Sequence, residues 1–411
     1  MSAQHLSRRM AVVVFLAFAL AYFFSALVRA ITATLSPVLT QELGLQASDL
    51  GLLAGGYFLG FSLTQLPLGR WLDRYGPRSV ILAFLAVAVL GCVAFAQADS
   101  FSGLLVARML CGVGVSACLM APLTGYRRWF NPSTQLRTNS WMLMTGSLGM
   151  VAATLPVQWL LPIWGWRALF VVMAVCIGVS MLAIRLLVPD WQRSQPGTQA
   201  HDDDGGYGAV WRSRYFWRMT PIGFFSYGGM VAIQTLWAGP WMTQVAGWTP
   251  LESATGLFAI NLSMLTSFWL WGWITPGLAR RGIHADALIA KGFPLSLLVL
   301  TALVLVGPAA GAGAAALLAA FCVCSTFVSL AQPAVGMAFP PHLAGRALSA
   351  YNLVIFAGIF VVQWGIGLGV DLARGLGLSN AAAYQAAFGA FGICSLLSWL
   401  FFCLFRADNQ R

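Results

Sequence analysis

The stretch LGRWLDRYGPRS, residues 68–79, lies between two long apolar runs and carries four charges in twelve residues. The charged side chains are Arg70, Asp73, Arg74 and Arg78. A glycine followed by a proline, as at residues 76–77, is typical of a tight turn. We therefore expect this stretch to be a short polar link between two apolar helices.

The composition on either side of the link is that of a membrane protein. Of the 411 residues 59% are hydrophobic and 9% are charged, and the mean hydropathy is +0.79, whereas about 25% charged residues are usual in soluble domains. Apolar runs near the 20 residues that a membrane-crossing helix needs recur along the chain, without the alternating strands of a β-barrel. We predict twelve crossings, at residues 10–36, 49–69, 79–98, 102–126, 138–161, 168–188, 219–243, 254–278, 287–307, 312–338, 347–371 and 382–405.

The arginines predict the orientation of the chain. With the N-terminus in the cytoplasm, 19 of the 23 basic residues fall in cytoplasmic segments, and only Arg167 and Arg374 fall on the opposite side. Cytoplasmic loops are enriched in Lys and Arg, so both chain ends are expected in the cytoplasm. The same asymmetry accounts for the net charge of +11 without a nucleic-acid partner.

The longest polar segment divides the chain into two halves. We expect a six-helix bundle over residues 1–188, a cytoplasmic linker over 189–218 and a second six-helix bundle over 219–411. The acidic run at residues 202–204 is more typical of a solvated linker than of a metal site. All eight cysteines fall in apolar spans, where packing as small hydrophobic residues is expected and a metal or redox role is the alternative.

The link at 68–79 has a counterpart in the second half. Between the eighth and ninth spans, WGWITPGLARRGIHA (271–285) again combines glycines with a basic pair. Matching links at matching positions indicate an internal duplication. Transporters are commonly built from such repeats, with a site near mid-membrane between them.

The segment GRWLDRYGPR (69–78) resembles the signature between helices two and three of the major facilitator superfamily. Its carboxylate is an anion available to cap a helix or to pair with a cation. The resemblance implies that Asp73 contacts the start of the eleventh helix and an arginine at the end of the fourth, which would hold the cytoplasmic side shut. A plain positively charged loop is the alternative. The predicted gating residues are Gly69, Asp73, Arg74, Gly76, Arg78, Arg127, Arg128 and Arg346.

Two further segments resemble the same superfamily. LLVARMLCGVG (104–114) is similar to its fourth-helix motif, and GWRALF (165–170) is similar to the opening of its sixth helix. TGSLGMVAATLP (145–156) departs from the Gly-Pro-x-x-Gly-Gly pattern that drug–proton antiporters carry in the fifth helix. The resemblance therefore favours this superfamily and lowers the expectation of a multidrug exporter.

Two arginines, Arg29 and Arg108, fall within apolar spans, and none of the 12 acidic residues is placed securely at mid-membrane. An arginine at the bilayer centre costs at least about 2.5–3.5 kcal/mol unless it faces water or a partner. Guanidinium groups match carboxylates bidentately, so we predict a cavity for a small organic anion. The alternatives are that Arg108 bonds to backbone carbonyls and that Arg29 extends outward to Glu42 or Asp49.

The other predicted substrate contacts are polar residues on the helices that line the cavity in the superfamily. Each of them is alternatively a polar contact between helices. These residues are Tyr22, Gln234, Trp237, Asn261, Tyr351 and Asn352.

Together these features predict an all-α integral membrane protein with the major facilitator fold, in a bacterial inner membrane. The expected function is secondary transport of a small solute by alternating access, with a proton or a counter-substrate as the coupled partner and lipid around the protein. No GxxxxGK[ST] loop for ATP occurs. Efflux of amphipathic drugs and a non-transporting sensor are the alternatives. We expect no enzymatic activity, no bound metal and no cofactor. The resemblance also implies a monomer, which is the superfamily's usual state.

Overall fold

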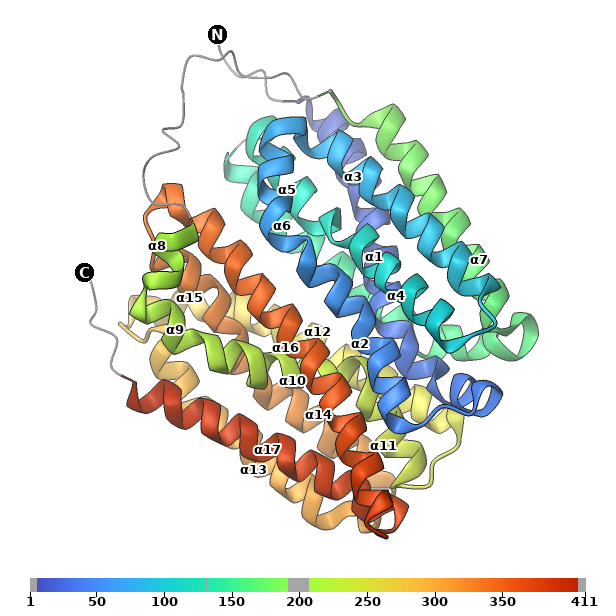
Figure 1. Ribbon diagram of the computed structural model, residues 1–411. Helices are drawn as coiled ribbons and strands as arrows, with labels where there is room; N and C mark the ends of the chain where they lie inside the picture. The colour runs from blue at the N-terminus through green and yellow to red at the C-terminus, as the bar shows by residue number, and fades with distance from the viewer. Residues whose placement is uncertain (1–5, 131, 191–206, 406–411) are drawn as a thin grey trace.

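The computed structural model describes residues 6–130, 132–190 and 207–405, which form helices and short turns without a β-strand. The first half contains seven helical elements that make six crossings (Figure 1). Gly76 (φ 79°) and Gly165 (φ 71°) each divide one long element into consecutive crossings. Glycine adopts such positive φ values at little steric cost. The elements are α1 (Arg8–Leu43), α2 (Ala47–Leu63), α3 (Gln65–Gln97), α4 (Phe101–Val115), α5 (Ala117–Trp129), α6 (Pro132–Ala152) and α7 (Leu155–Leu187).

The second half begins with a short helix and then makes six further crossings. Its first crossing contains two π-helical turns, a feature that often marks functional sites. The elements are α8 (Tyr207–Arg212), α9 (Arg214–Pro221), η1 (Ile222–Tyr227), α10 (Gly228–Ala232), η2 (Ile233–Trp237), α11 (Ala238–Gln244), α12 (Pro250–Arg280), α13 (Ala285–Val306), η3 (Gly307–Gly313), α14 (Ala314–Ser325), η4 (Thr326–Leu330), α15 (Ala331–Met337), α16 (Pro341–Gly375) and α17 (Asn380–Leu404).

The predicted twelve-helix architecture is confirmed, with helix ends that differ from the predicted spans by up to several residues. Within the described residues, eight helical stretches are long and apolar enough to cross a membrane, and the 53-residue stretch Ala285–Met337 contains two crossings. The second, fifth and seventh crossings are assembled from shorter elements: α2 with the start of α3, α6 with the start of α7, and α9 to α11. Continuous apolar length is therefore sufficient to find most crossings, but not all.

The two halves lie side by side, and α2 of the first half packs along α16 of the second (Figure 1). Helix α1 also contacts η2 and α11, while α12 contacts α6 and α7. A Cβ atom on Gly51 would lie 2.4 Å from the Gln363 carbonyl oxygen, so the α2–α16 contact depends on the absence of a side chain there.

The start of α1 and the end of α17 lie on the same side of the molecule. The Leu6 amide donates to the Trp129 carbonyl at the end of α5 (3.0 Å), and Arg214 at the start of α9 lies 5.8 Å from the Phe405 ring centroid. An even number of crossings requires this arrangement. The distribution of arginines identifies this side as the cytoplasmic one.

Part of the predicted linker is helical. Residues 207–218 form α8 and most of α9, where Ser213 Oγ accepts from the Phe216 amide (3.3 Å) and Trp211 packs edge-on against Phe216 at 5.1 Å. The buried Phe216 also contacts Tyr351 of α16, which holds this end of the segment against the second half. The acidic run at 202–204 lies outside the described residues, and the division at 188 and 218 stays a prediction.

Candidate functional site

The link between the second and third crossings contains the predicted cytoplasmic gate. Partial burial raises the pKa of the Asp73 carboxyl above its ordinary value, while the positive charges of Arg127 and Arg346 act in the opposite direction. Arg127 lies in the last turn of α5 and Arg346 lies near the start of α16, so the carboxylate is close to both predicted helix ends. The Arg128 side chain lies outside the described residues. The gating role stays a prediction.

The other gating candidates have separate positions. Arg78 pairs with Asp190 and donates from Nη2 to the Arg185 carbonyl (2.6 Å), which attaches the link to the end of α7 in the same half. Arg74 lies 5.3 Å from the ring centroid of its neighbour Tyr75. Gly69 faces Ser349 of α16, whose Oγ would lie 4.0 Å from a Cβ there.

One residue at this gate was missed by the sequence analysis. The Tyr207 hydroxyl donates to the Leu66 carbonyl (3.0 Å) and interacts with Ser349, so α8 touches both halves at their cytoplasmic ends. No local signal predicted this contact, because Tyr207 follows directly after a polar segment whose course the sequence does not define.

Arg108 is buried between α4 and α1. Its side chain is 1% exposed, and Nη2 donates to Thr32 Oγ1 (2.5 Å) and to the Arg29 carbonyl (3.4 Å). Its guanidinium carbon lies 5.0 Å from the Tyr57 ring centroid, whereas Nε and Nη1 are buried without a hydrogen-bond partner. Arg108 therefore bonds to one backbone carbonyl, as the alternative interpretation expected, but its Nε and Nη1 still lack acceptors.

Arg29 faces the contact region between the halves. It is only partly buried, it interacts with the hydroxyls of Tyr22 and Tyr57, and it lies within electrostatic range of Tyr227 in the second half. Its guanidinium carbon is 5.8 Å from the Phe61 ring centroid, and its Nε is buried without a partner. Arg29 and Arg108 therefore share one region, and their common neighbour is Tyr57.

The two acids proposed as outer partners of Arg29 have other contacts. Glu42 pairs with Arg167, and Asp49 accepts from the Gln46 amide (3.0 Å). Among the described residues, no ion pair includes Arg29 or Arg108. The structure therefore does not support the outward extension of Arg29 to these carboxylates.

The remaining substrate candidates make contacts between helices. Gln234 Nε2 donates to Asn261 Oδ1 (3.0 Å), and Asn352 Oδ1 accepts from Gln332 Nε2 (2.5 Å). Trp237 Nε1 donates to the Gln363 carbonyl (3.0 Å), and the Tyr351 hydroxyl donates to the Met219 carbonyl (3.1 Å). Of the predicted set, the structure brings Tyr22, Arg29 and Arg108 together in one place and Gln234 and Asn261 together in another.

Tyr57, Phe61 and Phe356 were not predicted for the site. Tyr57 and Phe61 are four residues apart on α2 and so share a helix face. Phe356 of α16 lies 4.1 Å from Phe61 between ring centroids. The spacing in the segment GYFLGF (56–61) was available as a signal, but no sequence pattern connects it to Phe356.

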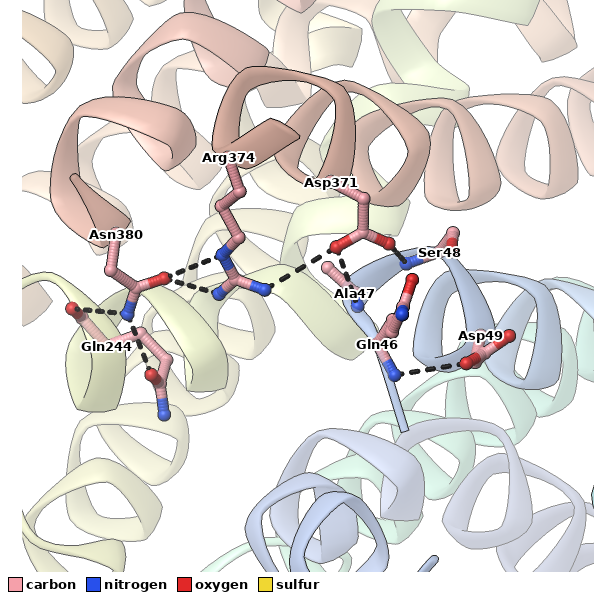
Figure 2. A network of polar contacts seen from close by, with 8 residues as sticks. All are labelled: Gln46, Ala47, Ser48, Asp49, Gln244, Asp371, Arg374 and Asn380. Carbon is pink, nitrogen blue, oxygen red and sulfur yellow. Dashed lines mark hydrogen bonds and ion pairs between the residues drawn. The ribbon is translucent and has the colours of Figure 1, made fainter. Parts of the chain in front are cut away.

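A polar network joins the halves at their outer ends (Figure 2). The Asp371 carboxylate accepts from the backbone amides of Ala47 (3.2 Å) and Ser48 (2.7 Å), at the first turn of α2. Arg374 reaches Asp371 (3.5 Å) and donates from Nε to Asn380 Oδ1 (3.0 Å). A carboxylate at a helix N-terminus satisfies free amides and complements the helix dipole. We call the Asp371 contact with α2 the outer latch.

A cavity of about 250 Å³ lies beside this network. Neither Arg29 nor Arg108 lines it, so it belongs to the outer ends of the halves and not to the arginine region. Its polar lining includes Thr40, Gln46, Thr243, Gln244, Arg374 and Tyr384.

Comparison with known proteins identifies the family of the chain. A family model described as the Major Facilitator Superfamily matches residues 18–363. A probable L-galactonate transporter of Escherichia coli (strain K12) is 24% identical over 299 residues, which are 66% of this chain and 65% of that protein. A 4-hydroxybenzoate transporter of Pseudomonas putida is 29% identical over 192 residues, 46% of this chain and 42% of that protein. The chain thus spans less than two-thirds of either relative.

Solved structures support the same fold. A bacterial homologue of the human lysosomal transporter Spinster, inward-facing and unoccupied, superposes with a TM-score of 0.78 at 17% identity and covers 97% of each chain. A D-xylose–proton symporter superposes with a TM-score of 0.78 at 14% identity, covering 97% of this chain and 99% of that one. At these identities the likeness shows the fold alone.

Proposed function

Because the chain belongs to the Major Facilitator Superfamily, we propose that it is a secondary transporter of a small organic anion. It is a multi-pass protein of a bacterial inner membrane, and the family consists of transporters and not of enzymes. The names of the curated relatives include acids of different shapes, L-galactonate and 4-hydroxybenzoate. These names support an anionic substrate but do not identify which anion this chain carries.

The observation that carries this proposal is the environment of Arg29. Arg29 is partly exposed near the middle of α1, has aromatic and phenolic neighbours, and has a buried Nε without a partner among the described residues. An arginine in this position is expensive unless an anion or water compensates it. A substrate carboxylate would supply the missing acceptors with bidentate geometry.

Arg108 adds a second positive charge next to Arg29. It is too buried to contact a solute in this conformation, but its guanidinium lies beside the Arg29 carbonyl, and its Nε and Nη1 are buried without a hydrogen-bond partner. Two cations with no carboxylate partner among the described residues make the region electrostatically favourable for an anion. We therefore assign direct substrate contact to Arg29 and a supporting role to Arg108.

Alternating access would follow from the contacts between the halves. The outer latch joins the halves on one side, and Asp73 lies near Arg127 and Arg346 on the other. Rocking of one bundle against the other would break these contacts in turn and expose Arg29 to each side. Coupling to a proton or to a counter-substrate is compatible with this arrangement.

The test is ligand-dependent thermal stabilisation of the purified protein in detergent. The panel contains small carboxylates, phosphorylated metabolites, neutral sugars and amphipathic cations, each measured with wild type and with Arg29→Gln. A ligand that binds the folded state at a hundredfold excess over Kd stabilises it by about 2.7 kcal/mol. We expect stabilisation by carboxylates that Arg29→Gln removes, while the melting temperature without ligand stays close to that of wild type.

The opposite result selects the alternative functions. Stabilisation by amphipathic cations that is insensitive to Arg29→Gln would replace the proposal with drug efflux. Ligand binding without uptake into proteoliposomes would favour a non-transporting sensor.

A further inference from the structure

We infer that the transported anion is an aromatic carboxylate whose ring packs on the aromatic side chains around Arg29. This inference rests on the proposed function, because it takes Arg29 as the group that binds the carboxylate. It goes further by naming the chemical class of the rest of the substrate.

The walls of the region around Arg29 are aromatic on both sides of the contact between the halves. Phe61 of α2 lies 5.8 Å from the Arg29 guanidinium carbon, and Phe356 of α16 lies 4.1 Å from Phe61 between ring centroids. Tyr227 of η1 is within electrostatic range of Arg29. Phe356 and Tyr227 are only partly buried, whereas Phe61 is buried. A planar ring could pack against these faces in offset or edge-on geometry.

The polar groups nearest the Arg29 guanidinium are the phenolic hydroxyls of Tyr22, Tyr57 and Tyr227. The Tyr57 hydroxyl already donates to the Ser25 carbonyl (3.4 Å). A carboxylate needs donors of this kind, and a hydroxyl substituent on a ring could use one more. A ligand with one charged end and a largely apolar body fits this distribution.

A polyhydroxylated acid fits it poorly. Each sugar hydroxyl that leaves water needs a new partner, and an unpaired one is costly. Three amide donors of the second half are already engaged: Gln234 Nε2 with Asn261, Gln332 Nε2 with Asn352, and Gln363 Nε2 with Thr235. These donors would have to leave their partners to bind sugar hydroxyls, whereas an aryl group makes no such demand.

The position of the rings also connects binding to conformational change. Phe61 belongs to the first half, and Phe356 and Tyr227 belong to the second. Phe61 and Phe356 are already in contact, so a substrate ring would pack beside this pair and touch both bundles at once. Binding would therefore favour the conformation in which the bundles are closest around Arg29.

The experiment compares four acids of graded chemistry on the full-length protein: benzoate, 4-hydroxybenzoate, cyclohexanecarboxylate and galactonate. Cyclohexanecarboxylate keeps the charge and approximate size of benzoate but has no π system. Binding is measured by isothermal titration in detergent, and uptake by counterflow in proteoliposomes. We expect the two aromatic acids to bind at least about threefold more tightly than cyclohexanecarboxylate, and galactonate to bind most weakly.

Two variants test the residues. Phe356→Leu removes an aromatic face, and we expect it to weaken binding of benzoate about threefold to tenfold while leaving cyclohexanecarboxylate unchanged. Phe84→Leu makes the same substitution at a part-buried phenylalanine that packs on Trp71, away from this region, and should leave both affinities unchanged. Arg29→Gln should weaken all bound acids at least about tenfold.

The outcomes separate this inference from the proposed function. If galactonate or cyclohexanecarboxylate binds as tightly as benzoate, and Arg29→Gln weakens that binding, the aromatic class is wrong and the anion transporter stands. If no acid binds in an Arg29-dependent manner, both are wrong. Should Phe356→Leu fail to fold, the ranking of the four acids on the wild-type protein decides the question alone.

Discussion

Arg108 carries a positive charge in a position that is 1% exposed, and its burial is balanced by a small number of contacts. The Thr32 hydroxyl accepts from Nη2 at 2.5 Å, and the Tyr57 ring faces the guanidinium at 5.0 Å. Removing a partner from a buried charged group costs more than the bond itself contributes, because the group remains desolvated. The packing of α1 on α4 should thus be sensitive to the loss of a single hydrogen-bond acceptor of Arg108.

We predict that Thr32→Val destabilises the protein by about 1–3 kcal/mol, because the buried guanidinium loses its closest acceptor. Thr32→Ser keeps the hydroxyl and should be close to wild type. Thermal unfolding of the purified proteins in the same detergent measures both. A valine variant that melts at the same temperature as the serine variant would show that the Arg108–Thr32 contact contributes nothing.

At the scale of elements, the outer end of α1 is attached to α7 by a second cluster of polar contacts. Glu42 pairs with Arg167 and accepts from Trp166 Nε1 (2.6 Å), and Arg167 lies 4.1 Å from the Trp166 ring centroid. The hydrogen bond from Arg167, with a second from Trp166, holds the pKa of the Glu42 carboxyl below its usual range. This cluster attaches the outer end of α1 to α7 directly after the glycine turn at Gly165.

The lowered pKa of Glu42 predicts a pH dependence with a definite sign. Its stabilising contribution is present above the ordinary glutamate pKa of about 4.3 and is lost as the pH falls through the lower folded-state pKa. The Arg167 and Glu42 side chains are 39% and 40% exposed, so the contribution at pH 7 should be about 1 kcal/mol or less.

We therefore expect Glu42→Gln to melt slightly below wild type at pH 7 and the difference to vanish below about pH 3. Thermal unfolding of both proteins across this pH range is the measurement. A difference that stays constant from neutral to acidic pH would refute the role of the Glu42 charge.

On the scale of the whole molecule, the two bundles meet along α2 and α16, and the outer latch closes one end of that contact (Figure 2). Asp371 belongs to the second half, and the amides of Ala47 and Ser48 belong to the first. Hydrogen bonds to a charged acceptor contribute about 1.5–3 kcal/mol. The latch is thus strong enough to bias the equilibrium between the closed and open states of the outer side.

We predict that Asp371→Asn shifts this equilibrium toward the outward-open state by about tenfold, because the amide is a weaker acceptor and only one of its two polar atoms accepts. A cysteine placed at Thr243, which lines the outer cavity, should then react correspondingly faster with a membrane-impermeant maleimide. The native cysteines require a parallel measurement without the added cysteine.

Asp49→Asn is the matched control for the outer latch. Asp49 accepts from the Gln46 amide within the same half, so its loss should destabilise the start of α2 without separating the bundles. Equal acceleration of labelling by both substitutions would mean that fraying of α2, and not the contact between the halves, controls access.

The site itself was predictable only in part. The sequence identified Arg29 and Arg108 because a charge inside an apolar span is conspicuous whatever its neighbours are. It could not distinguish Tyr22, beside Arg29, from Trp237, whose indole donates to the Gln363 carbonyl at 3.0 Å. In an apolar helix a polar side chain facing a partner helix and one facing a cavity have the same local pattern.

What the sequence by itself determined is the membrane class, the number of crossings, the orientation and the turn at Gly76. Each depends on a contiguous segment: the length of an apolar run, the side on which arginines accumulate, or one glycine at a helix break. Only the tertiary structure decided that Phe356 lies against Phe61 and that Asp371 caps α2. These contacts join residues far apart in the chain, and lipid and protein are equally apolar neighbours, so hydrophobicity alone cannot select which faces meet.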